Sequence, residues 1–397
     1  MPGGRVKAIT GSIRVRGSRK VVPGPAGIDG GWYEGCCRLP VEFTVMASMA
    51  LTPHTLNQDG LGVGDVALYT RRFWWTMLLI LLLTFLFPAE ILSPPLSSLK
   101  ARPGVSIAGQ DVGGLAREEL LVLVARVADR YRRPPVNATL DRKTGGVIAG
   151  LNGWEVDIPA TVNRILNASE GEVVSFAFRE LKPQLTIDHF PQAPVYQGNG
   201  LKKEMALVIN VAWGNEHLKP LLHLLDQYQV KGTFFIVGRW AEAFPNLVKE
   251  IAARGHEIGN HGYTDEELKV DSLTREEMVQ QILQAGKVLA GLTGQKIRYF
   301  SPHKGESNRL LLETAAQLGY RTIFWSLDTV DWMRPGKEAI INRVLGNAHN
   351  GAIILIHPID QTVEAMKEVI PSVQQQGYRL VTISRLLSPF WLEPARP

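Results

Sequence analysis

The stretch ALVINVAWGNEHL (residues 206–218) predicts a buried strand, a sharp turn at Gly214 and the start of a helix. Such a unit is typical of α/β proteins, in which reacting groups usually follow the strand ends. The tip of this turn carries Ala212 and Trp213, and neither side chain can hold a proton or a metal ion. The stretch therefore indicates an α/β fold and leaves open whether the turn belongs to an active site.

Apolar strand patterns alternate regularly with helical patterns from this stretch to the C-terminus. The predicted strands cover residues 206–212, 233–237, 257–260, 297–300, 322–327, 352–357 and 380–383. The predicted helices cover residues 216–228, 241–253, 275–292, 308–318, 337–345 and 362–375. This alternation predicts a parallel barrel or a doubly wound sheet. In either fold the loops after the strands converge on one site.

Residues able to carry chemistry or to stack on a ligand stand in those loops. They are Trp213, Asn215, Glu216, His261, Asp265, Ser301, His303, Lys304, Asp328, Asp331, Trp332 and His357. His217, His223, His256 and His349 fall on helices or at a strand start, so we interpret them as structural or solvated.

Four segments in this region form a recognisable set, KGTFFIVG (231–238), ARGHEIGNH (253–261), WSLDTVDW (325–332) and GAIILIH (351–357). With them the region resembles the polysaccharide deacetylases of the NodB-homology type, which remove acetyl groups from N-acetyl sugars. The resemblance extends from about residue 205 to 387, with the family's five motifs in order. It implies an irregular (β/α) barrel of about seven parallel strands.

The resemblance also implies a mechanism. Members of the family hold a divalent metal, usually zinc, with one Asp and two His, and the metal polarises the acetamide carbonyl and activates a water. A second Asp acts as base, a His acts as acid, and an Arg orients the base.

Only part of that machinery has a counterpart in this chain. Ala212 stands at the position of the base and Trp213 at that of the metal-binding Asp. The second motif has His261 and Asp265 where the family has two His, and Ser301 replaces the Arg.

The fourth and fifth motifs are retained, with Asp328, Asp331, Trp332, Leu355 and His357. By the resemblance His357 would be the general acid and Asp331 its charge partner. Trp332 and Leu355 would line the acetyl pocket.

Two interpretations stay open at the altered positions. His261 and Asp265 could hold a metal with Glu216 or His303 as third ligand, or they could hydrogen-bond each other. Trp213 could be a platform for a sugar ring, with His303 also contacting the ligand, or a plug in the vacated metal cavity.

Four further segments are expected on the N-terminal side of the barrel. We expect an unstructured tail at 1–70, a signal or membrane anchor at 71–92, a small α+β domain at 103–186 and a linker at 187–203 before the barrel at 204–390. The anchor contains FWWTMLLILLLTFLF (73–87), which carries no charge and follows Arg71 and Arg72. A buried core helix is the alternative. The tail predicts a later start of translation, at Met46 or Met49.

Residues 103–186 resemble a peptidoglycan-binding domain found ahead of catalytic domains in Gram-positive envelope proteins. The segments GVSIAGQDVGGLAREE (104–119) and GWEVDIPATVNRIL (153–166) carry this resemblance, and a structural spacer is the alternative.

Composition limits the classes of partner. Residues 1–72 hold 9 of the 43 Lys and Arg and 5 of the 38 Asp and Glu, so the rest of the chain is nearly neutral, which argues against a nucleic-acid partner. The only cysteines, Cys36 and Cys37, are adjacent and provide neither a disulfide framework nor a spaced metal-ligand pair.

Two function classes follow for an exported, membrane-anchored protein that faces N-acetylated cell-wall glycan or peptidoglycan. One is a hydrolase of acetamide C–N bonds with a rearranged zinc site, and the other is a non-catalytic glycan-binding or scaffold protein. The resemblance to a divergent branch of the family suggests a role in sporulation. The oligomeric state is not predicted.

Overall fold

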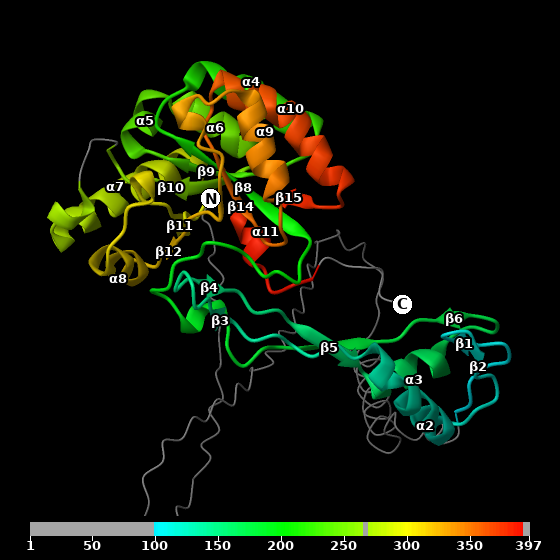
Figure 1. Ribbon diagram of the computed structural model, residues 1–397. Coiled ribbons are helices and arrows are strands. Elements are labelled where there is room, and N and C mark those ends of the chain that lie inside the picture. The colour runs from blue at the N-terminus through cyan, green and yellow to red at the C-terminus, as the bar shows by residue number, and fades with distance from the viewer. Residues whose placement is uncertain (1–98, 265–268, 392–397) are drawn as a thin grey trace, which may run out of the picture. The chain divides into compact units, whose positions relative to one another are not determined.

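The computed structural model describes residues 99–264 and 269–391 (Figure 1). The predicted tail, the predicted signal or anchor at 71–92, and Asp265 lie outside the described residues. Within these two ranges, no helix is both long enough and apolar enough to cross a membrane.

A parallel sheet forms the centre of the C-terminal region, as the alternation of strands and helices predicts. Its strands are β8 (Glu204–Val211), β9 (Thr233–Ile236), β10 (Glu257–Asn260), β11 (Tyr299–Phe300), β12 (Arg321–Thr322), β13 (Leu327–Asp328), β14 (Ile353–Ile356) and β15 (Arg379–Val381). They are ordered β12-β11-β10-β9-β8-β14-β13, and β15 pairs with the first residues of β8. The predicted α/β class with a parallel sheet is confirmed.

The predicted strand at 322–327 is wrong in one respect, because it forms two strands instead of one. β12 pairs with β11 and β13 pairs with β14, so these two short strands are the opposite ends of the strand order. Between them Ile323 bridges to Val195, and the Ser326 amide donates to the carbonyl of Ile353. The sheet is therefore curled and open at this point, and the predicted barrel is a half-barrel.

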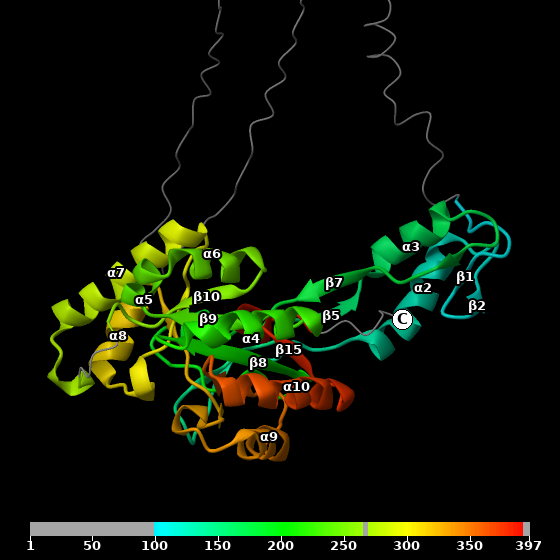
Figure 2. The same cartoon turned by 90° about the horizontal axis from the view of Figure 1, so that it is seen from above.

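Helices connect the strands, and most of them cover the outer face of the sheet. They are α4 (Asn215–Gln227), α5 (Gly238–Ala243), α6 (Pro245–Ala253), α7 (Arg275–Thr293), α8 (Arg309–Gln317), α9 (Lys337–Gly346) and α10 (Asp360–Gln375). One more helix, α11 (Ile383–Leu387), follows β15 and packs in the cluster that contains Ala206 and Val208 of β8. The predicted helix at 241–253 starts earlier and breaks at Phe244, because Pro245 begins a new helix at its first position. α10 packs beside α9 and also contacts α4 (Figure 2).

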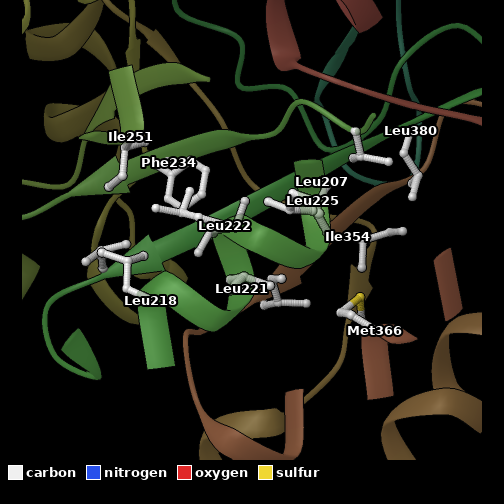
Figure 3. Close-up of a cluster of buried hydrophobic side chains, with 14 of the residues drawn as sticks. Leu207, Leu218, Leu221, Leu222, Leu225, Phe234, Ile251, Ile354, Met366 and Leu380 are labelled. Atoms are coloured by element: carbon white, nitrogen blue, oxygen red, sulfur yellow. The ribbon is translucent and has the colours of Figure 1, made fainter. Parts of the chain in front are cut away.

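Alternating residues of β8 face two different cores. Leu207 and Ile209 pack with the leucines of α4 and with Met366 of α10 (Figure 3). Ala206 and Val208 pack in a separate cluster on the inner face of the sheet. All eight residues of β8 are buried, as expected for the central strand of a parallel sheet. Asn210 and Ala212 continue the inner face toward the carboxyl end of the strand.

The last helix, α11, has no counterpart among the predicted elements. The buried ammonium of Lys202 donates to the carbonyl oxygens of Arg385, Leu386 and Ser388, at 3.0, 3.1 and 3.1 Å. Lys202 also pairs with the buried carboxylate of Glu204 at 2.7 Å. A contact between residues so far apart in the chain has no local signature, which is why the pattern of residues 383–387 alone did not predict the helix.

The N-terminal described region contains short strands and two helices. They are β1 (Ser106–Ile107), β2 (Gln110–Asp111), α2 (Arg117–Ala128), β3 (Thr139–Leu140), β4 (Val147–Ile148), β5 (Gly153–Val156), α3 (Ile158–Asn167), β6 (Val173–Val174) and β7 (Phe178–Leu181). α2, α3 and β1 share a hydrophobic cluster of their own. The β3–β4 hairpin instead contributes Ala138 and Val147 to the cluster on the inner face of the parallel sheet.

Candidate functional site

A cavity of about 590 Å³ lies at the carboxyl ends of the parallel strands. It is lined by Asn210, Ala212, Trp213, His261, His303, Lys304, Trp325, Asp328, Trp332, Leu355 and His357. The structure therefore brings eight of the predicted site residues to one cavity, namely Trp213, His261, His303, Lys304, Asp328, Trp332, Leu355 and His357. Parallel strands make this convergence possible, because their carboxyl ends meet at one edge of the sheet.

Asp331 holds His357 from beneath the cavity. One carboxylate oxygen accepts from the His357 backbone amide at 2.7 Å, and the other lies 2.7 Å from Nδ1 of the same ring. Thr362 donates to the first oxygen at 2.6 Å. Asp331 is fully buried, so the carboxylate is enclosed by its partners. The contact fixes the ring with Nδ1 toward the carboxylate and Nε2 on the opposite side.

A strained loop carries Asp331 and Trp332 between β13 and α9. Val330 and Arg334 both have φ of 55°, a left-handed conformation that is unusual for side chains other than glycine. The Val330 amide donates to Oδ1 of Asp328 at 2.8 Å, and Arg334 forms an ion pair with Asp360 at 2.7 Å. Strain of this kind persists where the surroundings enforce it, and it is common at functional sites. In this loop the backbone conformation places Asp331 in the interior, whereas the next residue, Trp332, is 55% exposed.

Trp213 lies flat against His357 at the edge of the cavity. Their ring centroids are 5.5 Å apart and their planes differ by 5°. The indole is also 43% exposed, so part of it remains open to solvent. Trp213 therefore packs against His357 while part of its indole stays exposed, and both interpretations of this residue, as a sugar platform and as a plug, stay predictions.

The turn that presents Trp213 depends on Gly214. This residue has φ of 80°, and a Cβ at this position would collide with the carbonyl oxygen of Pro358. Glycine is thus required both by the backbone conformation and by the close approach of the segment after β14. The two segments that carry Trp213 and His357 are in this way held against each other.

His261 is buried at the side of the cavity, directly after β10. Its Nδ1 lies 2.7 Å from the carbonyl oxygen of Ser301, so Nδ1 carries the proton and Nε2 is the basic nitrogen. Burial, followed by the nearby His303, holds the pKa of His261 well below its ordinary value. The two rings are 4.1 Å apart between centroids. A neutral imidazole with Nδ1–H on a carbonyl is the usual arrangement of a metal-binding His.

A zinc ion needs at least two more nitrogen, sulfur or oxygen ligands at the same point. Among residues 99–264 and 269–391, no three His, Cys, Asp or Glu side chains are grouped so that they could hold a metal ion. The position of the family's aspartate is Trp213, whose indole lies against His357 instead. The described residues therefore do not fit the metal, and Asp265 lies outside them.

Four of the predicted residues that the structure describes lie apart from the lining of the cavity, and one of them, Asn215, accepts a hydrogen bond from the indole N–H of Trp240 at 3.3 Å. Glu216, in the first turn of α4, has a carboxylate 68% exposed and 3.6 Å from the ring of His217. Ser301 is buried and contributes its backbone carbonyl to His261. Asp331 also lies below the lining, where it contacts His357.

Asn210 and Trp325 line the cavity although they were not among the predicted site residues. Asn210 was not predicted as a site residue because it lies inside a strand pattern, whereas the candidates were taken from the loops after the strands. An asparagine in an otherwise apolar strand is nevertheless a signal of a buried polar group. Trp325 lies in the predicted strand at 322–327, which the structure divides, so its direction was not predictable from alternation.

Comparisons with known proteins show which family the chain resembles in sequence. Residues 197–323 match the family model described as polysaccharide deacetylase. A peptidoglycan-N-acetylglucosamine deacetylase of Bacillus cereus is 38% identical over 173 residues, which cover 42% of this chain and 80% of that protein. The uncharacterized protein YlxY of Bacillus subtilis is 34% identical over 270 residues, covering 68% of this chain and 82% of that protein.

A solved structure is also similar to this chain. Wild-type BA3943 of Bacillus anthracis, described as a CE4 family pseudoenzyme, is 33% identical with a TM-score of 0.60, covering 69% of this chain and 96% of that one. A mutant of BA3943 is described as having restored enzymatic activity.

Proposed function

Because the chain belongs to the polysaccharide deacetylase family, we propose that it binds N-acetylated cell-wall glycan in this cavity without hydrolysing the acetamide. One observation carries the proposal. Trp213 stands where the family's motif has a metal-binding Asp, and its ring is stacked on His357, the position of the family's acid.

The groups that hydrolysis requires are incomplete among the residues around the cavity. Amide cleavage needs a base to take a proton from water and a group that polarises the carbonyl. Ala212, at the position of the base, has a methyl group that cannot accept a proton. His357 and Asp331 retain their contact, but an acid without those two partners provides little acceleration.

The same cavity has the composition of a ligand-binding pocket. Its walls include the aromatic rings of Trp213, Trp325 and Trp332, with a small number of polar groups such as Asn210 and Asp328. Ligand sites generally combine apolar and aromatic walls with a few polar groups that orient the ligand. Indole rings present a flat apolar face with a polar N–H, which suits the apolar face of a sugar ring.

The relatives support a cell-wall glycan as ligand and a place outside the cytoplasm. One is a peptidoglycan-N-acetylglucosamine deacetylase, and BA3943 is a pseudoenzyme of the same family. We extend the proposal to the predicted anchor at 71–92, which would hold the protein at the membrane, and to residues 103–186, which would help it dock on peptidoglycan.

The test has two parts. Isothermal titration calorimetry measures the binding of N-acetylglucosamine oligomers to the full chain, and a separate assay measures any acetate that is released. We expect saturable binding, no acetate, and about fivefold weaker binding or more in Trp213→Ala, since covering the exposed indole face with a sugar ring removes apolar surface from water and contributes about 1 kcal/mol or more.

The matched control is Phe390→Ala, which removes an exposed aromatic ring that is not part of the cavity lining. It should leave binding unchanged. Absence of binding in the wild-type chain, or release of acetate at a steady rate, would contradict the proposal.

A second candidate is a hydrolase with a rearranged site, and the intact contact between Asp331 and His357 favours it. It requires at least two metal ligands besides His261, and the predicted candidates are Asp265 and, as the third ligand, Glu216 or His303. Metal analysis of the purified chain separates the two. A stoichiometric metal that is lost in both His261→Ala and Asp265→Ala, with acetate release, would support the hydrolase.

A further inference from the structure

The segment at 187–203, which the sequence predicts as a linker, is held against the parallel sheet along much of its length. The guanidinium of Arg321, in β12, donates to three backbone carbonyl oxygens of this segment, those of Ile187, Phe190 and Ala193. Val195 is fully buried in the hydrophobic cluster on the inner face of the sheet. A connection that only joined two regions of the chain would not need these contacts.

The same segment crosses the opening of the half-barrel. The Val195 amide donates to the Thr322 carbonyl at 2.9 Å, and the Val195 carbonyl accepts from the Phe324 amide at 2.8 Å. Three residues later, the Gly198 amide donates to the carbonyl of Gly351, just before β14, at 2.7 Å. The segment therefore joins the two sides of the opening with backbone hydrogen bonds.

A series of aromatic rings leads from this segment to the cavity. Tyr196 is stacked on Phe324, with 4.8 Å between the ring centroids and 13° between the planes. Phe324 is 4% exposed and meets Trp325 edge to face, with 6.3 Å between the centroids. Trp325 lines the cavity, whereas Tyr196 and Phe324 do not. Trp325 is thus supported by rings that lie outside the lining.

A second contact to Trp325 comes from the turn at 303–305. A Cβ on Gly305 would lie 2.8 Å from Cη2 of the indole, so the backbone of this turn packs directly against the ring. The two preceding residues, His303 and Lys304, line the same cavity. The orientation of Trp325 therefore affects a whole wall of the cavity, and a preorganised wall lowers the cost of binding a ligand.

The parallel sheet alone does not determine that orientation. Phe324 and Trp325 lie between β12 and β13, outside both strands. The ladders of the sheet therefore do not decide which of these two side chains faces the cavity. The hydrogen bond from the Phe324 amide to Val195 holds the backbone at this point, and the ring of Tyr196 holds the Phe324 side chain.

We propose that Tyr196 is a positioning residue of the glycan site, which acts through Phe324 to hold the indole of Trp325 on the wall of the cavity. The inference rests on the proposed function, since it concerns a wall of the same site. It makes the predicted linker a part of that site, because the segment that connects the N-terminal region to the sheet also shapes the surface offered to the ligand.

The first experiment is a double-mutant cycle on the full chain, with the affinity for an N-acetylglucosamine tetramer measured by isothermal titration calorimetry. Tyr196→Ala should weaken binding about threefold to tenfold, the size of a lost aromatic pair. In a Trp325→Ala background the same substitution should have no further effect, because the side chain through which it acts is absent. Tyr196→Phe keeps the stacked ring and should bind as the wild type does.

Tyr378→Ala is the matched control. Tyr378 is also half-buried, but it packs on the hydrophobic cluster of the outer face and is not part of the cavity lining. Its substitution should leave the affinity unchanged. Tyr196→Leu, which fills part of the volume without a ring, is the second variant in case the alanine variant does not fold.

A measurement without ligand tests the position of the indole directly. The full chain is labelled with fluorotryptophan, and the fluorine NMR signal of Trp325 is identified by its loss in Trp325→Phe. This signal should shift in Tyr196→Ala and Tyr196→Leu, because the support of the indole is lost. It should stay in place in Tyr196→Phe and Tyr378→Ala.

The results separate this inference from the proposed function. An unshifted Trp325 signal in both Tyr196→Ala and Tyr196→Leu overturns the inference. Equal losses of affinity in the wild-type and Trp325→Ala backgrounds, or a similar loss in Tyr378→Ala, also overturn it and give Tyr196 a purely structural role. Failure of the wild-type chain to bind the tetramer overturns the proposed function, and the NMR signal then still decides whether Tyr196 positions the indole.

Discussion

Thr362 and the His357 backbone amide donate to the same carboxylate oxygen of Asp331, at 2.6 and 2.7 Å. The other oxygen is 2.7 Å from the His357 ring. Asp331 and His357, which the resemblance assigns to acid catalysis, are thus part of a buried polar network between the β13–α9 loop, the end of β14 and α10. This network gives the pair a role in the folded structure that does not depend on catalysis.

Replacement of Asp331 by Ala should destabilise the protein by about 3 kcal/mol or more, because it leaves several buried donors without an acceptor. Urea unfolding followed by circular dichroism measures this change. The control is Asp360→Ala, which removes an exposed ion pair with Arg334 and should cost less than about 1 kcal/mol. Equal losses in the two variants would contradict the assignment of Asp331 to the core.

Gly214→Ala should destabilise the protein more than Gly319→Ala, although both glycines have φ of 80°. At Gly319 a Cβ meets no atom within 4 Å, so only the backbone conformation is penalised, by about 1 kcal/mol. At Gly214 the Cβ collides with the Pro358 carbonyl, which forces the turn away from the segment after β14. A difference in unfolding free energy of about 1 kcal/mol or more between the two variants is expected.

Binding should respond to the same pair of variants. Because Gly214 presents Trp213 to the cavity, its substitution should weaken the affinity for N-acetylglucosamine oligomers, and Gly319→Ala should not change that affinity. Unchanged binding by a folded Gly214→Ala variant would show that the turn does not position the indole.

Stability should fall as the pH is lowered from about 6.5 to 4, and His256 is one cause. Burial, followed by the nearby Lys231, lowers the pKa of His256 to about 4. Its Nδ1 accepts from the Gly232 amide at 3.2 Å, an interaction that a proton on Nδ1 would abolish. Between these pH values the unfolded chain binds a proton that the folded chain does not, so folding loses up to about 3 kcal/mol.

Urea midpoints measured at pH 7.5 and pH 5 test this dependence. His256→Asn, which keeps an acceptor for the Gly232 amide, should flatten the difference between the two pH values. The exposed His223 on α4 is the control, and His223→Gln should leave the difference intact. An unchanged pH dependence in His256→Asn would rule out the titration of this ring as a cause. His261, whose pKa is also lowered by burial, contributes in the same direction.

Local patterns predicted the order of strands and helices, because a buried parallel strand such as β8 is apolar on both faces. They did not predict that residues 322–327 are divided between two strands. The path of this segment is set by contacts with Val195 and Ile353, which are distant in sequence. The same limit applies to the site. His357 and Asp331 follow strands and were identified as candidates, whereas Asn210 sits within a strand and Trp325 within the divided segment.

The stacking of Trp213 on His357 illustrates a second limit. The motif comparison located both residues at strand ends, but the parallel arrangement of their rings depends on the approach of Gly214 to Pro358. The left-handed conformation of Val330, a β-branched residue, is equally unpredictable from propensity. Both features are imposed by tertiary contacts.

Restoring three of the family's missing groups, with Ser301 left in place of the Arg, should give the chain deacetylase activity. The variant Ala212→Asp, Trp213→Asp, Asp265→His supplies the base, the metal-binding Asp and the second His of the family motifs. His261 already has its Nδ1 engaged by the Ser301 carbonyl, so its Nε2 is available as a ligand.

We expect the triple variant to bind zinc and to release acetate from N-acetylglucosamine oligomers, with the wild-type chain inactive under the same conditions. Adding His357→Ala to the triple variant should lower the rate by about 10²–10⁴-fold, the usual contribution of a general acid. If the triple variant binds zinc and the oligomer but releases no acetate, the strained loop that holds Asp331 and His357 does not place them for catalysis. If the wild-type chain is already as active as the triple variant, Trp213 and Ala212 are not what limits hydrolysis, and the proposed binding function fails.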